Sequence, residues 1–233
     1  KQKKTNWILP EIMFRNMVVL QFILMILPLV VAVVLHELAH GYVANRLGDP
    51  TARLAGRLTL NPIKHLDVFG SFLLPVVLKL TGSPIIFGYA KPVPVNFTHL
   101  RPFRAGTIWV ASAGVLTNMI LAAISAALFQ MIAATEASWV QTQYELLAVL
   151  FLQLLTYSVI INCVLALFNL IPIPPLDGSR IVMMLLPVVL RRPYARLERF
   201  GMIIIFVLLI TGPLGRLMAF VLEPILDFLL GTS

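Results

Sequence analysis

Cysteine and charge are both scarce in this sequence. Cys163 is the only cysteine among 233 residues, so neither an intramolecular disulfide nor a cysteine-ligated metal site can form. We interpret Cys163 as a small apolar residue inside a helix. Only 12% of the residues are charged, about half the share usual in a soluble domain, whereas 59% are hydrophobic. This composition excludes an ordinary soluble domain and predicts an integral membrane protein.

Long uncharged runs support this prediction. Three runs without any charged residue occur at residues 16–35, 105–135 and 146–176. A helix needs roughly 20 apolar residues to cross a bilayer, so each run predicts a membrane span. A fourth candidate, residues 200–222, is interrupted only by Arg216. The apolar pieces at 68–78 and 181–190 are too short to cross and predict re-entrant, interfacial or protein-packed helices.

The net charge of +8 could suggest nucleic acid, but the basic residues are placed as in membrane loops. Residues 46–104 contain eight of them and residues 178–199 contain five, whereas residues 136–145 contain none. The positive-inside rule then puts the first two segments in the cytosol and the third outside. We therefore expect a lipid bilayer, and no nucleic acid, as partner.

The expected fold is an all-α polytopic membrane protein with about four to six transmembrane or re-entrant helices. The chain reads as one domain, 1–233, with its core at about 17–190 and a helical segment at 199–230. Two short extended segments are expected near the cytosolic face. Residues 51–60 alternate in polarity and predict a hairpin or edge strand. Residues 88–97 cannot be helical because Pro92 and Pro94 remove backbone donors.

The first apolar run ends in the sequence HELAH, residues 36–40. Residues four apart on a helix are offset by about 40°, so His36 and His40 project from one face and can bind one zinc ion at about 2.0–2.1 Å. Glu37 is rotated by about 100° and suits a general base acting on a water beside the ion. Ionisable groups at membrane depth cost about 2.5 kcal/mol or more each unless paired or hydrated. This cluster therefore predicts a metal site holding one Zn²⁺.

A catalytic zinc needs a third protein ligand and one open position. The candidates are His65, His99, Asp49, Asp67 and Asp177. Asp177 differs from the others because it lies in a proline-broken turn between apolar segments, with Arg180 as its only obvious cation partner. Its alternative role is to N-cap the helix that starts near Ser179. For His65, a hydrogen bond to backbone within its loop is favoured over a role in the site.

Taken together, several stretches resemble the site-2 protease family of intramembrane zinc metalloproteases. HELAH is combined with FNLIPIPPLDG, and the matching stretches follow the family's order from about residue 30 to about residue 180. The other matching stretches are GRLTLNPIKHLD at 56–67, GYAKPVPVN at 88–96 and AGVLTN at 113–118.

The resemblance implies His36, His40 and Asp177 as ligands of one Zn²⁺ and Glu37 as catalytic base and acid. It implies that Asn169 lies near the substrate backbone. Asn118 matches a Gly-x-x-x-Asn packing motif, and for it a substrate contact and a bridge between helices both stay open. The family's AGP-type tripeptide reads Ala113-Gly114-Val115 here, a departure expected to affect packing rather than catalysis.

The implied activity is zinc metalloendopeptidase hydrolysis of a peptide bond in or near the transmembrane segment of membrane-anchored proteins, as in regulated intramembrane proteolysis. The implied location is a bacterial or archaeal cytoplasmic membrane, with the active site toward the cytosol. We expect the compact form of the family, without a PDZ domain at 136–145 and without CBS domains after the core. The extended stretches at 51–60 and 88–96 are expected to hold an unwound substrate by strand addition. The alternative is an inactive membrane scaffold or a metal-binding or transport protein; against it, the sequence keeps Glu37 and contains no inverted repeat.

Overall fold

Three long helices form the centre of the molecule. A computed structural model describes residues 8–67, 91–135, 138 and 140–231, with residues 8–18 described by their backbone alone. The long helices are α1 (Ile8–Arg46), α4 (Phe103–Ala133) and α6 (Glu145–Leu170). Each contains a segment long and apolar enough to cross a membrane. The described residues contain helices and no β-strand, so the protein is an all-α polytopic membrane protein, as predicted.

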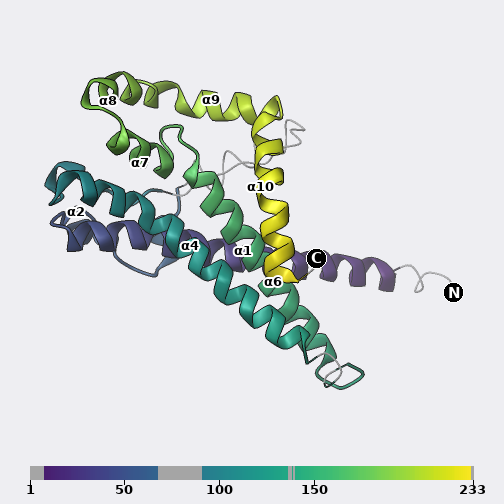
Figure 1. Cartoon of the computed structure of the whole chain (residues 1–233). Helices are drawn as coiled ribbons and strands as arrows, with labels where there is room; N and C mark the ends of the chain where they lie inside the picture. The colour runs from purple at the N-terminus through teal and green to yellow at the C-terminus, as the bar shows by residue number, and fades with distance from the viewer. Residues whose placement is uncertain (1–7, 68–90, 136–137, 139, 232–233) are drawn as a thin grey trace.

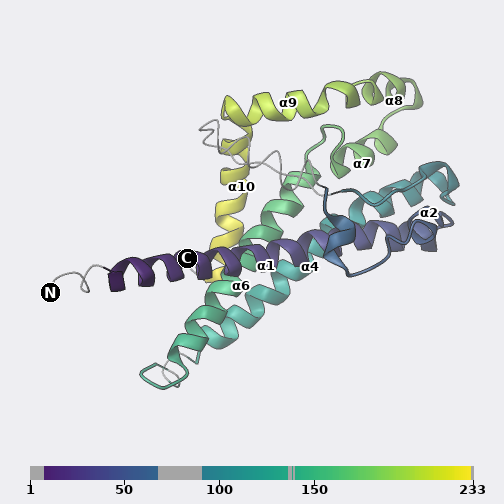
Figure 2. The same cartoon turned by 180° about the vertical axis from the view of Figure 1, so that it is seen from behind.

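The half of α1 that contains the HELAH sequence lies beside the start of α4. In both views the C-terminal half of α1 runs beside the N-terminal half of α4, close to the short helix α2 (Thr51–Leu54), while the first turns of α1 project away from the other helices (Figure 1, Figure 2). The α4–α6 connection lies at the opposite end of α4 from α2. This places the metal-binding pattern of α1 against α4 rather than against α6.

The buried face of α4 consists almost entirely of small residues, which lets α1 and α6 approach its backbone closely. These residues recur at helical spacing, so they form one face of the helix. They are Gly106, Thr107, Val110, Ala111, Ala113, Gly114, Val115, Asn118, Ala122, Ser125 and Ala126.

The α4–α6 contact contains an apolar cluster that is covered by α10 (Pro213–Leu230). Cys163 is buried in this cluster, which confirms its interpretation as a small apolar core residue. The cluster consists of Ala122, Ala126, Val159 and Cys163, with Leu222, Ile225, Leu226, Leu229 and Leu230 packed against it.

The prediction of one span at 200–222 is corrected by a sharp bend. Helix α9 (Glu198–Ile210) and helix α10 meet at an angle of 74°, so they form at most one broken span. Gly212 adopts φ +95°, a left-handed conformation that costs glycine little, and Pro213 starts the next helix, where its missing N–H is not needed. With this pair counted as one, the described residues contain four candidate spans.

The predicted hairpin or edge strand at 51–60 is wrong. Thr51–Leu54 form helix α2, and Asp49, which precedes its N-cap Pro50, accepts hydrogen bonds from the backbone N–H and the hydroxyl of Thr51 in the first turn. Gly56, at φ +63°, then turns the chain. The apolar piece at 181–190 is too short to cross, as predicted, and divides between α7 (Asp177–Leu185) and α8 (Val188–Ala195) at Pro187. The piece at 68–78 lies outside the described residues.

Residues 91–96 have no regular secondary structure, so the predicted absence of helix in the proline-containing stretch is confirmed for them, whereas residues 88–90 lie outside the described part. Helix α6 ends at Leu170, and residues 171–176 form turns that lead into α7.

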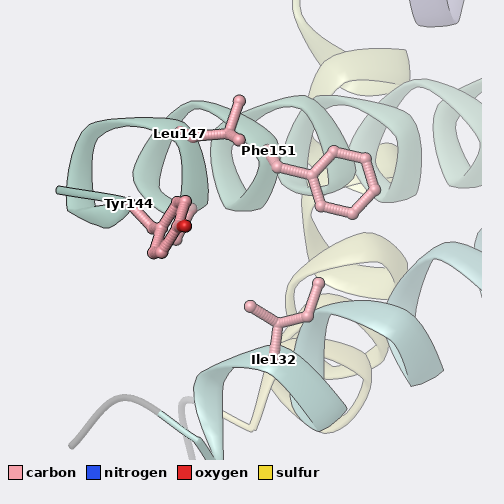
Figure 3. A pocket seen from close by; sticks show the side chains of 5 residues that line it. Ile132, Tyr144, Leu147 and Phe151 are labelled. Atoms are coloured by element: carbon pink, nitrogen blue, oxygen red, sulfur yellow. The ribbon is translucent and has the colours of Figure 1, made fainter. Parts of the chain in front are cut away.

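An apolar pocket lies between the far ends of α4 and α6. Figure 3 shows Ile132 of α4 facing Tyr144, Leu147 and Phe151 across it, and Ala148 completes the lining. Ile132 follows Gly114 by 18 residues on α4, which is about 27 Å along the helix at 1.5 Å per residue. The pocket is therefore remote from the HELAH region.

Candidate metal centre

Three side chains from two distant segments converge on one point. The Nε2 atoms of His36 and His40 are 3.0 Å apart, and Asp177 Oδ2 lies 3.2 Å from each of them. Both histidines are buried, and the Asp177 side chain is 20% exposed. Among the described residues these three form the one group of His, Cys, Asp and Glu side chains with ligand atoms close enough to share a metal ion.

Helix α4 fixes which nitrogen of each imidazole faces the cluster. His40 Nδ1 lies 2.7 Å from the backbone carbonyl of Val110, which can only accept, so Nδ1 carries the proton. His36 Nδ1 lies 2.5 Å from Asn118 Oδ1 and donates to it. Each Nε2 is therefore left with a lone pair directed at Asp177 and its partner histidine, as metal ligation requires.

Asp177 is placed by close backbone packing at the start of α7. A Cβ atom on Gly178 would collide with the carbonyl oxygen of Leu170, so only glycine lets α7 begin against the end of α6. A Cβ on Gly201 of α9 would likewise collide with the Pro174 carbonyl. Helix α9 therefore packs directly on the backbone of the turn before Asp177, on the side away from α6. Asp177 is the first residue of α7 and makes no capping hydrogen bond. Arg180 pairs with Glu198 at 2.9 Å.

The donor set fits a zinc ion. With bonds of about 2.0–2.2 Å, the ligand atoms of a tetrahedral zinc lie about 3.3–3.6 Å apart, a little more than the observed 3.0–3.2 Å. Asp177 Oδ2 is buried without a hydrogen-bond donor. Three lone pairs facing one another in a buried site repel unless a cation lies between them. Two imidazoles and one carboxylate leave a fourth position open, as catalytic zinc sites do.

Gly114 provides the space for this cluster. A Cβ atom there would lie 2.5 Å from His36 Cε1 and from His40 Nε2, so α4 can approach the histidine pair only with glycine at this position. Val115, which follows Gly114 and takes the place of the proline in the family's AGP-type tripeptide, is buried on the same face of α4.

Glu37 contacts an extended segment of the chain. Its Oε2 accepts a hydrogen bond of 2.7 Å from the backbone N–H of Val93. We call residues 91–96 the strap. The Val93 side chain is buried against α1, where a Cβ on Gly41 would lie 2.8 Å from Val93 Cγ1.

The strap is fixed at both ends by long-range hydrogen bonds. At one end, Lys91 donates its N–H to the His65 carbonyl at 2.9 Å and accepts from Arg57 at 2.8 Å through its own carbonyl. At the other end, Asn96 N–H donates to Asp49 Oδ2 at 2.6 Å. The strap therefore lies across α1 at a fixed position.

Asp49 is the central anchor of this region and is fully buried. Burial raises the pKa of its carboxyl group, but hydrogen bonds from Thr51, Asn96 and His99 outweigh this and bring the pKa below its ordinary value. The carboxylate thus stays ionised and joins the end of α1, the start of α2 and the strap. In the sequence Asp49 is only a candidate metal ligand, and its role as an anchor could not be predicted because the contact with Asn96 spans 47 residues.

The remaining candidate ligands lie elsewhere. His65 is buried in its loop with Nε2 at 2.9 Å from the Thr59 carbonyl, in line with the expected backbone hydrogen bond. His99 pairs with Asp49 at 3.3 Å. Asp67 is not part of the cluster of ligand atoms.

The two asparagines differ in their surroundings. Asn118 is fully buried and joins α4 to His36 of α1 and to Asn162 of α6. Asn169 is partly exposed in the last turn of α6, where its amide nitrogen donates to the Leu165 carbonyl at 2.9 Å. Asn169 directly precedes Leu170, whose carbonyl faces Gly178.

Comparison with known proteins agrees with this arrangement. Residues 24–212 match the model of Peptidase family M50, and the chain belongs to this family of metalloproteases, with zinc as its metal. Among its relatives, "Putative zinc metalloprotease YwhC" of Bacillus subtilis (strain 168) is 41% identical over 206 residues, covering 87% of this chain and 85% of the relative. "Putative zinc metalloprotease Rip2" of Mycolicibacterium smegmatis is 31% identical over 196 residues, covering 84% and 70%. No solved structure matches the chain.

The space at Gly114 gives a prediction for metal binding. Gly114→Ala should weaken zinc binding by about 10- to 100-fold, because the added methyl group displaces the histidine pair. Zinc affinity of the purified protein, measured by competition with a chelator, tests this. Gly106→Ala on the same helix is the control, since its Cβ would meet the side chains of Leu100, at 3.1 Å, and of Leu47, at 3.8 Å, and neither histidine. Equal zinc affinity in the Gly114 variant and wild type would contradict the prediction.

Proposed function

We propose that this chain is an intramembrane zinc endopeptidase that cleaves membrane-anchored proteins in or near their transmembrane segment. The observation that carries the proposal is the convergence of His36, His40 and Asp177 on one point, with Glu37 directly after His36 on the same helix. Membership of Peptidase family M50 supports the reaction class. The intact donor set and Glu37 argue against an inactive scaffold or transporter.

Each residue has a definite part in the proposed reaction. His36, His40 and Asp177 would hold the ion, and Asn118 and the Val110 carbonyl keep the imidazoles in the ligating tautomer. Bound zinc supplies a Lewis acid that lowers the pKa of a water to about 7 and polarises the scissile carbonyl. Glu37 accepts the proton of the attacking water as the C–O bond forms. It then returns that proton to the leaving amine as the C–N bond breaks.

The position of the site supports action within the bilayer on the cytosolic side. His36 precedes Arg46, the last residue of α1, by ten residues, which is about 15 Å along the helix. Both histidines therefore belong to the candidate span Val19–Arg46. The basic residues that follow at 46–104 favour a cytosolic location for this end of α1, in a cytoplasmic membrane. Water must then reach the cluster from that side.

The test compares wild type with Glu37→Gln. Both proteins should bind zinc, and cleavage of a membrane-anchored reporter should fall by about 10²–10⁴-fold in the variant, because the general base is lost. Zinc content and cleavage rate are measured on the same preparations. Equal cleavage by both proteins would remove Glu37 from the mechanism, and absence of cleavage by zinc-loaded wild type would favour the scaffold.

The strap supplies the hydrogen bond that orients Glu37. Because Val93 N–H holds Oε2, the other carboxylate oxygen is the one left to accept a proton. The anchors Asp49 and Arg57 keep this N–H in place. We infer that the backbone of the strap, rather than another side chain, positions the catalytic base.

Substituting proline for Val93 removes this donor and should lower kcat by about 10- to 100-fold, since a hydrogen bond to a charged group contributes about 1.5–3 kcal/mol. Zinc affinity should not change. Val93→Ala keeps the N–H and measures the loss of side-chain packing alone. Val95→Pro tests proline insertion at a position whose N–H makes no hydrogen bond within the described residues. An equal loss of kcat in the Val93→Ala variant would show that packing, not the N–H, matters.

The strap also limits how a substrate can pair with it. In an extended segment, alternate residues direct their backbone groups to opposite edges. The edge of Lys91 and Val93 is occupied by His65, Arg57 and Glu37. The other edge offers the carbonyls of Pro92 and Pro94 and no N–H. A substrate strand there would donate N–H groups to the strap and keep its own carbonyls free for attack.

A photo-crosslinking residue placed at Pro94 in the Glu37→Gln protein should therefore capture a membrane-anchored substrate near its cleavage site. The same residue placed at Leu60, in the other expected substrate-binding stretch, should not, because residues 51–54 are helical, residues 55–56 turn the chain and Leu60 lies in a bend, so this stretch offers no strand edge. Mass spectrometry of the crosslinked peptides gives the result. Crosslinks at Leu60 alone would contradict substrate pairing with the strap.

A further inference from the structure

A row of polar side chains crosses the otherwise apolar contact between α4 and α6. Asn118 and Ser125 lie on α4, and Ser158 and Asn162 lie on α6. Asn118 is 0%, Asn162 2% and Ser125 8% exposed. The neighbouring residues are the small and aliphatic side chains of the Cys163 cluster. Polar groups at this depth are costly unless they are hydrogen-bonded, and mark function more often than packing.

These side chains form one continuous set of hydrogen bonds that ends at the metal cluster. Asn162 Nδ2 lies 2.9 Å from the Ser158 carbonyl, and Asn118 Nδ2 lies 2.8 Å from Asn162 Oδ1. Asn118 Oδ1 lies 2.5 Å from His36 Nδ1. Ser158 and Ser125 extend the row away from the metal through a contact of 2.8 Å between their hydroxyl oxygens.

The Ser158 backbone carbonyl, at the end of the set far from the metal, fixes the donor and acceptor of every hydrogen bond between it and His36. The Ser158 carbonyl can only accept, so the amide nitrogen of Asn162 must face it. Asn162 Oδ1 then faces Asn118 and requires a donor there. The Asn118 amide nitrogen meets this requirement and also faces the Ala32 carbonyl, 3.4 Å away. Asn118 Oδ1 is thereby turned to His36 and accepts from Nδ1–H.

We propose that Asn162 is a positioning residue of the metal centre, acting through Asn118 on His36. Asn162 touches neither the ligand atoms nor the substrate. It keeps the Asn118 amide in the orientation that holds His36 with its proton on Nδ1 and its lone pair on Nε2. His40 receives the same constraint directly from the Val110 carbonyl, whereas His36 depends on two intervening amides.

The inference rests on the zinc site of the proposed function but not on proteolysis. Zinc affinity and the His36 Nδ1–H signal are both measured without a substrate, in the Glu37→Gln background. A failure to cleave proteins would therefore leave these measurements unaffected. The competing explanation is that Asn162 only joins α4 to α6, in which case its loss would change stability and neither zinc affinity nor the His36 Nδ1–H signal.

The variants are Asn162→Ala and Asn162→Leu, which remove the acceptor for Asn118 with a smaller and a larger apolar side chain. Ser125→Ala is the matched control, because it shortens the same row but leaves Asn162, Asn118 and His36 connected. We expect zinc affinity of the full-length chain, measured by chelator competition, to fall by about tenfold or more in both Asn162 variants. The Ser125 control should match the parent protein.

Nitrogen NMR of histidine-labelled protein gives an independent readout, since the chain contains only four histidines. In the zinc-loaded parent protein the His36 Nδ1–H should give the signal of a hydrogen-bonded proton, and in the zinc-loaded Asn162 variants this signal should shift, because the hydrogen bond to Asn118 is disturbed. A folded Asn162 variant with the parent's zinc affinity and an unchanged His36 Nδ1–H signal would overturn the proposal. An equal loss of affinity in Ser125→Ala would also overturn it, because general packing would then explain the effect.

Discussion

Two imidazole nitrogens and a carboxylate oxygen direct their lone pairs at one point inside an apolar helix bundle. Such an arrangement is unstable without a cation, and the surrounding structure exists largely to maintain it. Gly114 lets α4 approach the histidines, and Gly178 lets α7 begin where its first residue can reach them. Close packing of α9 on the Pro174 carbonyl then restrains the turn from which Asp177 projects. The metal centre thus depends on backbone contacts that larger residues would prevent.

Helix α4 is the element that makes the histidine pair specific for metal. HELAH spacing puts both imidazoles on one face of α1, but spacing alone does not decide which ring nitrogen carries the proton. Val110 and Asn118, on the facing surface of α4, accept from the two Nδ1 atoms and so decide it. The small residues on this face therefore do two things: they allow close packing in the membrane and they bring hydrogen-bond acceptors within reach of the ligands.

Much of this architecture follows from local sequence. The remaining parts depend on contacts between residues that are far apart in the chain. Uncharged runs predict α1, α4 and α6 because a chain in lipid must satisfy its own backbone, and a helix does so within one segment. Alternating polarity at 51–60 gave the wrong structure: residues 51–54 form a helix whose first turn donates a hydrogen bond to the Asp49 carboxylate. The bend at Gly212 lies inside an apolar run, so hydropathy alone predicts one continuous span there. Asn162 belongs to no motif, and only its contact across helices with Asn118 reveals it.

The metal ligands and the proposed catalytic base are held by different kinds of structure. His36, His40 and Asp177 lie on helices whose backbones are in direct contact, so their positions are coupled to the packing of the whole bundle. Glu37 takes its orientation from one N–H of the strap, a segment without helix or strand structure that is fixed only at its ends. A substrate strand that pairs with the free edge of the strap would contact the same backbone segment that donates a hydrogen bond to Glu37. Substrate binding and alignment of the base would then be coupled through Val93, while the metal site stays fixed.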